Sequence, residues 1–194
     1  FVTSFDLAYT VSGGLAELFS GKFNKQFHVI MNVPLIKNYE LRITNYELKT
    51  PVTLLYQGAL NEGRGLENLI EAMKEIDAKL KLAGEGDLSD ELRSLTKKLN
   101  LENKVEFLGY IKPETLKQLT AQADIGINLL ENKGLSYYYS LSNKFFDYIQ
   151  QDIPQVCIDF PEYKKINEQY EVALLIKNCS VHEIKATIER LMTD

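Results

Sequence analysis

From Pro51 to the end of the chain, short β-rich apolar runs alternate with longer segments of helical periodicity. The first pair is a run at Val52–Tyr56, followed by apolar residues at helical spacing from Leu66 to Ile76. Strands that alternate with helices in this way predict right-handed βαβ units, and such units build a parallel sheet. We therefore expect an α/β domain with helices on both faces of one parallel sheet.

The remaining elements follow the same alternation and predict a Rossmann-like domain. Further strands are predicted at Leu80–Ala83, Val105–Leu108, Ile125–Leu130, Val156–Ile158 and Val172–Ile176. Further helices are predicted over Leu88–Leu99, from Pro113 through Leu119, over Lys144–Gln150, and after Ser180, where Ser180 and Glu183 fit a capping box. A tyrosine-rich loop is predicted between Leu130 and Lys144.

The first 50 residues are less regular. Short strands are predicted at Asp6–Ser12 and Phe27–Met31, and Gly13-Gly14 opens a short helical stretch between them. Asn-Tyr-Glu-Leu occurs twice, at 38–41 and 45–48, which is too few copies for a repeat architecture and indicates a linker. We expect residues 1–50 to be the end of a preceding domain with a hinge, and residues 51–194 to be the α/β domain. The chain begins without Met or a basic n-region, which predicts a piece of a longer protein rather than a signal peptide.

Composition excludes several functional classes. The formal net charge of −5 argues against non-specific binding to nucleic acid or to an anionic membrane. No apolar run approaches the ~20 residues that span a bilayer. The two cysteines, Cys157 and Cys179, are too few for a disulfide framework or a zinc site, and this favours a reducing, cytoplasmic setting. His28 and His182 have no visible partner for catalysis, so neither is assigned a role.

In open parallel sheets, ligands bind beyond the carboxyl ends of the strands. The loop after the first strand runs from Gly58 to Gly65, and its glycines allow close approach of a ligand to the backbone. Arg64 in this loop has the forked geometry that suits phosphate oxygens. The spacing is neither that of a P-loop nor that of the dinucleotide fingerprint, and a plain glycine-rich turn with a surface arginine stays open as an alternative.

The next two loops are less specific. The loop at Gly84–Asp87 places small residues between a strand and a helix, and a tight turn that caps the helix explains it equally well. In the following loop, Gly109, Tyr110 and Ile111 would expose backbone groups beside an aromatic ring, a surface that suits a flat base. A simple strand-to-helix connection is the alternative there.

The fourth loop leads into the predicted helix at residue 144. Ser142 or Asn143 can cap that helix, and the N–H groups of its first turn, with Lys144 beside them, would hold a diphosphate. Asp147 follows one turn later, where a carboxylate could accept hydrogen bonds from ribose hydroxyls. A capped amphipathic helix with Phe145 in the core is compatible with this interpretation.

Taken together, the loops resemble the C-terminal domain of the retaining GT-B glycosyltransferases of family four, the glycosyl transferases group 1. The matching segments, in family order, are Tyr56-Gln57-Gly58 with Arg64-Gly65-Leu66, residues 82–86, residues 105–111, residues 123–127, Ser142-Asn143-Lys144-Phe145-Phe146-Asp147-Tyr148 and residues 153–156. They cover the chain from residue 52 to about residue 176. The opening segment, residues 7–12 through 32–34, looks like the end of the family's N-terminal domain and its hinge.

The resemblance implies a UDP- or GDP-sugar donor, no metal ion or other cofactor, and transfer of a hexose with retention to a glycan, lipid or small-molecule acceptor in polysaccharide biosynthesis. Carried over by position, the residues at the diphosphate are Gly58, Arg64, Asn143 and Lys144; Asp147 binds the ribose; Gly109, Tyr110 and Ile111 face the base; and Gly84, Glu85 and Tyr139 lie by the donor sugar. The partner it implies is an N-terminal acceptor domain, through which any peripheral membrane contact would be made. Nucleic acid is not an implied partner.

Two departures from the family pattern keep a second hypothesis open. Tyr139 occupies the first acidic position of the paired-glutamate motif, and Ala59 stands where a basic residue often follows the first glycine. The alternative is therefore a degenerate, non-catalytic binding or assembly module. The fragment itself is not expected to turn over, because catalysis needs both reactants in a closed cleft. A receiver domain is disfavoured because Leu54–Gln57 has no acidic cluster, and a dinucleotide-dependent epimerase because the early fingerprint is absent.

Overall fold

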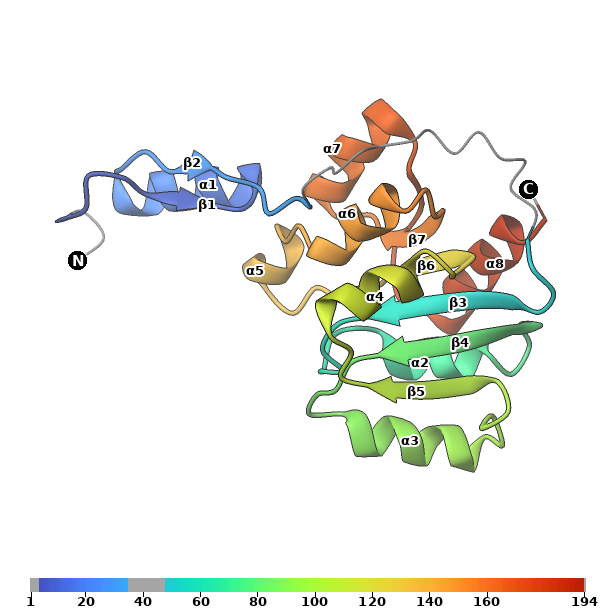
Figure 1. Cartoon of the computed structure of the whole chain (residues 1–194). Coiled ribbons are helices and arrows are strands. Elements are labelled where there is room, and N and C mark those ends of the chain that lie inside the picture. The colour runs from blue at the N-terminus through green and yellow to red at the C-terminus, as the bar shows by residue number, and fades with distance from the viewer. Residues whose placement is uncertain (1–3, 35–47, 194) are drawn as a thin grey trace.

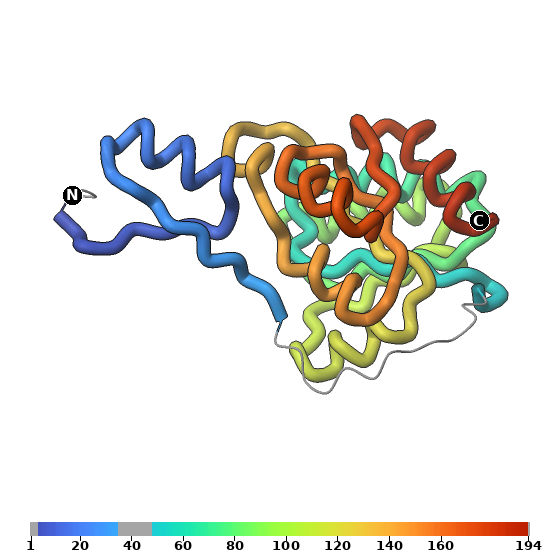
Figure 2. Tube along the Cα trace, turned by 90° about the horizontal axis from the view of Figure 1, so that it is seen from above, coloured from blue at the N-terminus to red at the C-terminus, as the bar shows by residue number. Residues whose placement is uncertain are grey.

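The computed structural model describes residues 4–34 and 48–193, which form an α/β body and a smaller N-terminal arm (Figure 1). The predicted linker falls mostly within 35–47, so most of the duplicated Asn-Tyr-Glu-Leu segment lies outside the described residues. In two views at right angles the arm projects away from the body (Figures 1 and 2).

The body is built on a parallel sheet of six strands, as the alternation predicts. The strands are β3 (Val52–Gln57), β4 (Ala78–Ala83), β5 (Val105–Gly109), β6 (Ile125–Asn128), β7 (Gln155–Ile158) and β8 (Ala173–Ile176), in the order β5-β4-β3-β6-β7-β8. Every neighbouring pair is parallel. The order runs outward in both directions from β3 and β6, so the chain reverses its direction of progress between these two strands. This junction is the topological switch point, where doubly wound sheets bind ligands.

Helices cover both faces of the sheet. The helices of the body are α2 (Leu66–Ala72), α3 (Ser89–Lys98), α4 (Pro113–Thr120), α5 (Leu135–Tyr138), α6 (Asn143–Gln150), α7 (Pro161–Tyr170) and α8 (Val181–Leu191). Helix α2 packs between α3 and α8, while α4 contacts α6 on the opposite face. Because both faces are covered, the central strand β3 is mostly apolar, with Leu54, Leu55 and Tyr56 fully buried. The expectation of a Rossmann-like α/β fold is confirmed.

Two helices begin at local sequence signals. Pro113 lies in the first turn of α4, where its missing N–H costs nothing. Ser180 caps α8 by accepting a hydrogen bond at 3.3 Å from the Glu183 backbone N–H. The reciprocal half of the predicted capping box is absent, because the Ser180 N–H donates to Asn178 Oδ1 instead. The capping-box prediction is thus correct for the serine and wrong for the glutamate.

Two helices were not predicted from the sequence. Helix α7 connects β7 to β8, and its only buried residue is Tyr163. Its sequence therefore has no apolar periodicity that would indicate a helix. Helix α5 lies within the expected tyrosine-rich loop and has no buried residue. Both are held by contacts to neighbouring elements rather than by their own pattern.

The arm consists of β1 (Tyr9–Thr10), α1 (Gly13–Phe23) and β2 (His28–Val29), with β1 and β2 paired in parallel. One attachment of the arm to the body is at the start of α1, where the N–H groups of Gly13 and Gly14 donate to the Glu162 carboxylate at 3.2 and 2.7 Å. The Ser12 hydroxyl adds a bond of 2.6 Å to the Tyr139 carbonyl. The first turn of α1 is thereby satisfied by α7 and by the segment after α5.

Helix α6 is seated on the sheet by one close contact. Tyr148 of α6 is fully buried and donates its hydroxyl proton to the Leu55 carbonyl at 2.9 Å. Its ring lies over Gly126 of β6, where an added β-carbon would be only 2.6 Å from ring atoms. The absence of a side chain at Gly126 therefore sets the height of α6 above the switch point.

We expect Gly126→Ala to lower the free energy of unfolding by about 1–3 kcal/mol, because the methyl group overpacks the Tyr148 ring. Urea unfolding of the variant measures the loss. Gly21→Ala is the control, since no atom lies within 4 Å of an added β-carbon there. An unchanged urea midpoint for Gly126→Ala would show that α6 can shift to make room for the methyl group, so that Gly126 does not fix its position.

Candidate functional site

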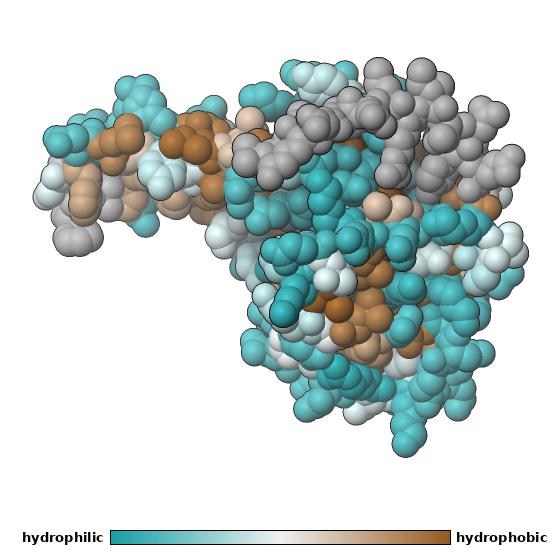
Figure 3. All heavy atoms as spheres, in the orientation of Figure 1, coloured by the Kyte–Doolittle hydropathy of each residue, from teal (hydrophilic) through white to brown (hydrophobic). Residues whose placement is uncertain are grey.

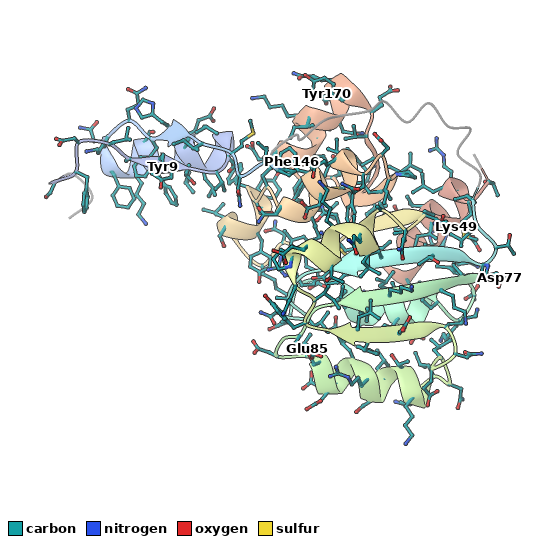
Figure 4. All side chains as sticks on the ribbon, viewed as in Figure 1. Tyr9, Lys49, Asp77, Glu85, Phe146 and Tyr170 are labelled. Carbon is teal, nitrogen blue, oxygen red and sulfur yellow. The ribbon has the colours of Figure 1, made fainter. Side chains whose placement is uncertain are left out.

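The four candidate loops meet at the carboxyl edge of the sheet. They follow β3, β4, β5 and β6, and because all these strands are parallel their ends lie on one side. Figure 4 shows Glu85 at this edge, whereas Lys49 and Asp77 lie at the opposite edge. The topology thus collects residues that are far apart in the sequence into one region.

The loops after β3 and β4 touch through their glycines. Gly58 and Gly84 have φ values of 129° and 154°, which side chains other than glycine rarely adopt. A β-carbon on Gly84 would lie 1.9 Å from the Gly58 carbonyl oxygen. Glycine at position 84 therefore lets the two loops pack backbone against backbone.

Lys144 is a buried cation next to Gly58. Its side chain is 8% exposed, and its Nζ lies 4.0 Å from the centre of the Tyr56 ring. Among residues 4–34 and 48–193 it forms no ion pair. Burial, and then the nearby positive charge of Arg64, lower the pKa of the Lys144 ammonium to about 7.

Arg64 brings a second cation to the same place. Its guanidinium lies 5.1 Å from the centre of the Tyr137 ring, and its Nε is buried without a hydrogen-bond partner. No carboxylate of the described residues pairs with it. Two like charges held together without a counter-charge destabilise one another, and an anion bound between them would remove that cost.

Helix α6 presents its amino end beside these cations. Ser142 occupies the N-cap position, but its hydroxyl donates to Asn128 Oδ1 at 3.0 Å and caps nothing. Within the described chain, the N–H groups of Asn143 and Lys144 donate to no protein acceptor. The prediction that Ser142 or Asn143 caps this helix is therefore wrong, and the uncapped turn is open to an anion. The Asn143 side chain is exposed, and its Oδ1 accepts a bond of 2.9 Å from Asn32 of the arm.

Asp147 lies one turn further along α6 and is half-buried. Its Oδ2 accepts a hydrogen bond of 2.8 Å from Gln57 Nε2 at the end of β3. Burial raises the pKa of the Asp147 carboxyl, and the bond from Gln57 opposes that rise. The carboxylate therefore faces the switch point, on the same helix that carries Lys144.

The loop after β5 lies next to the end of β4, on the side away from β3. Gly109 has a φ of 66°, and the Tyr110 side chain that follows is 78% exposed, while Ile111 packs partly against the core. Glu85 lies beside this loop, 3.4 Å from the position of a Gly109 β-carbon. Glu85 is also paired with Arg93 of α3 at 2.6 Å, which holds the pKa of its carboxyl below the usual range.

Tyr139 turns toward the arm. Its ring fills the space that a side chain on Gly14 would need, with ring atoms as near as 2.1 Å to the position of that β-carbon. It also packs edge-on against Tyr138, with ring centres 5.1 Å apart. The structure thus brings together Gly58, Arg64, Lys144 and Asp147, places Gly84, Glu85 and Gly109 at the neighbouring strand ends, and directs Tyr139 to the arm.

Two residues of this region were given no role from the sequence. Gln57 belongs to a motif quoted above, and the signal for it is a polar side chain that ends a buried strand. Glu162 caps the arm helix, and Pro161 before it is the local sign of a helix start. In the described part of the chain, no three or more His, Cys, Asp or Glu side chains form a group that could hold a metal ion. None of the helices in residues 4–34 and 48–193 has the length and apolar character of a membrane-spanning segment.

Comparison with known proteins gives concordant matches. Residues 40–194 match the family described as glycosyl transferases group 1. An uncharacterised glycosyltransferase, MJ1607 of Methanocaldococcus jannaschii, is 42% identical over 76 residues, which are 37% of this chain and 20% of that protein.

Solved structures share the fold. A mutant of S. aureus TarM superposes with a TM-score of 0.77 and 17% identity, over 99% of this chain and 38% of TarM. Anabaena HepE, solved with UDP-glucose, superposes with a TM-score of 0.76 and 18% identity, over 97% of this chain and 54% of HepE. The chain therefore spans about half the length of HepE and less of TarM.

The buried Lys144 predicts a pH dependence of stability. Its folded pKa is about 7, whereas an unfolded lysine titrates near 10.4. The unfolded state binds more protons between these values, so the free energy of unfolding rises from about pH 7 to about pH 10, by on the order of 2–4 kcal/mol from this group.

Urea unfolding across this pH range, compared between wild type and Lys144→Met, isolates the effect. The variant should lose the rise and be the more stable of the two at the acidic end. If the free energy of unfolding changes with pH in the same way in both proteins, burial does not lower the pKa of Lys144. The range stops near pH 10 because burial raises the pKa of Tyr56 to about 12, and above pH 10 that shift lowers stability.

Proposed function

This chain belongs to the glycosyl transferases group 1 family, and we propose that it is the nucleotide-sugar-binding half of a two-domain, retaining GT-B enzyme of family four. The observation that carries the proposal is the pair of cations, Arg64 and Lys144, at the switch point. They have no protein counter-charge among the described residues and lie beside the uncapped start of α6. This combination suits a diphosphate.

A diphosphate would satisfy every group that the protein leaves open here. The Arg64 guanidinium can bind two phosphate oxygens at once, and the Lys144 ammonium supplies a point charge. The N–H groups of Asn143 and Lys144 would complete the cradle with the positive end of the α6 dipole. Gly58 allows the phosphates to approach the backbone. These groups neutralise the leaving nucleotide without a metal ion, so the proposed reaction uses no cofactor.

The nucleoside would extend from the diphosphate along the strand ends. Asp147 accepts hydrogen bonds from the ribose hydroxyls, and the loop Gly109–Ile111 faces the base. UDP is the first donor nucleotide to test, because HepE was solved with UDP-glucose and TarM with UDP, and GDP is the second. The donor sugar would lie near the Gly84-Glu85 turn, and the transferred hexose would go to a glycan, lipid or small-molecule acceptor.

The N-terminal arm supports the division of the chain at about residue 50. Helix α1 covers one face of its two-stranded sheet, but Leu7, Tyr9 and Ile30 are more than half exposed. Figure 3 shows such apolar side chains along the arm. Parallel strands are normally covered on both faces, so residues 1–50 fit the end of an acceptor-binding domain that packs on this side. The buried, unpaired Cys157 and Cys179 fit a cytoplasmic enzyme.

A second candidate is a non-catalytic module that binds the nucleotide but transfers no sugar. The observation in its favour is Tyr139, which occupies the first acidic position of the family motif and packs against the arm. Both candidates require the diphosphate cradle. They differ in whether a donor sugar is contacted near residue 139.

The proposal predicts that the chain binds one nucleoside diphosphate and that three single substitutions weaken the binding. We expect Arg64→Ala and Lys144→Ala to raise the Kd by about tenfold or more, since a charge-assisted hydrogen bond contributes roughly 1.5–3 kcal/mol. Asp147→Ala should weaken binding to a similar extent. Calorimetric titration with UDP, GDP and ADP measures all of these values.

Lys97→Ala is the matched control, because Lys97 is an exposed cation on α3 away from the switch point. It should leave the Kd unchanged. If the folded chain binds none of the three nucleotides, the donor-site proposal fails. If it binds one with an affinity that none of the three site substitutions changes, the nucleotide lies elsewhere.

A further inference from the structure

We propose that Gln57 is a positioning residue that orients the Asp147 carboxylate toward the ribose hydroxyls of the donor. The inference rests on the proposed function and deepens it, because it assigns a role to a residue that does not itself touch the ligand. Its basis is a chain of side-chain hydrogen bonds that joins β3, α4 and α6 at the switch point.

Gln57 is the last residue of β3 and is 4% exposed. Its Oε1 lies 2.7 Å from the Thr120 hydroxyl at the end of α4, and that hydroxyl shares its one proton between Gln57 and the Leu116 carbonyl at 2.8 Å. Its Nε2 donates a hydrogen bond of 2.8 Å to Oδ2 of Asp147 in α6. A buried amide with one bond at each end has a fixed orientation, since a flip would set two acceptor oxygens against each other at Asp147.

The bond from Gln57 decides what Asp147 can offer a ligand. One carboxylate oxygen, Oδ2, is occupied by the amide, while Oδ1 receives no donor from the described protein. The carboxylate plane is thus fixed with its free oxygen available for a hydroxyl. Without Gln57 the half-buried carboxylate would lose the one donor that the described residues give it, so it would rotate toward water or take up a proton.

A purely structural role for Gln57 makes a different prediction. A glutamine that only satisfied its own buried position would affect stability, and it would change the binding of every nucleotide equally. A positioning role instead affects the preference for nucleotides that carry ribose hydroxyls. The ratio of the Kd of 2′,3′-dideoxy-UDP to that of UDP separates the two, because both nucleotides share the base and the diphosphate.

The test measures this ratio by calorimetry for the whole chain and its variants. For wild type we expect about tenfold preference for UDP, the effect of one charge-assisted hydrogen bond. Gln57→Leu should reduce the ratio to about twofold or less, and Asp147→Asn should reduce it similarly. In the double variant, Gln57→Leu should cause no further loss, because the residue acts only through Asp147.

Gln155→Leu is the matched control. Gln155 is another buried glutamine and is the first residue of β7. Its Nε2 donates to the Phe145 carbonyl of α6 rather than to Asp147. It should keep the tenfold ratio even if it lowers stability. Thr120→Val provides a second route, since it leaves Gln57 in place but removes the hydroxyl that holds its Oε1, and we expect it to reduce the ratio by about threefold.

The outcomes separate the inference from the proposed function. The positioning role is overturned if folded Gln57→Leu keeps the full preference for UDP. If that variant does not fold, the same result in Thr120→Val overturns it. In either case Asp147→Asn still tests the ribose site. Equal ratios in wild type and Asp147→Asn overturn the assignment of Asp147 itself, and with it the inference. Loss of the ratio in Gln155→Leu would show that any disturbance of α6 has this effect, and would also overturn it.

Discussion

Lys144 is a cation that the fold removes almost completely from water without giving it a carboxylate partner. Its ammonium rests on the Tyr56 ring, and the nearby charge of Arg64 has the same sign. Burying an unpaired charge costs several kcal/mol, and proteins keep such a group where a ligand supplies the missing charge. The remaining features of the site are consistent with an anion at this point.

The surrounding structure leaves the first turn of α6 uncapped. Ser142, which could cap α6, is diverted to Asn128, and the N–H of Ser142 is satisfied by the Tyr163 hydroxyl. Tyr148 anchors α6 to β3 through a bond to Leu55, so the uncapped first turn has a fixed place. The start of α6 thus lacks the stabilisation of a side-chain cap, a local departure of the kind that functional sites often show.

The fold was largely predictable because it depends on local patterns. Apolar runs located all six strands, and the rule for parallel sheets explains why the four candidate loops meet at one edge. The hydrogen-bond partners were not predictable, since Gln57 and Asp147 are 90 residues apart in the sequence and meet only through strand order. Helix α7 was not predicted because Tyr163 is its one buried residue, which gives no apolar periodicity. The bond from Ser142 to Asn128 was not predicted because nothing in the local sequence shows that the serine hydroxyl binds elsewhere.

The most direct measurement is a crystal structure of the chain with UDP. We expect the diphosphate to lie at the switch point, with its oxygens within hydrogen-bond distance of the Lys144 ammonium, the Arg64 guanidinium and the Asn143 N–H. We also expect a ribose hydroxyl to donate to Oδ1 of Asp147. A nucleotide bound elsewhere, with Lys144 still resting on Tyr56 and no anion beside it, would show that Arg64 and Lys144 do not form the diphosphate site.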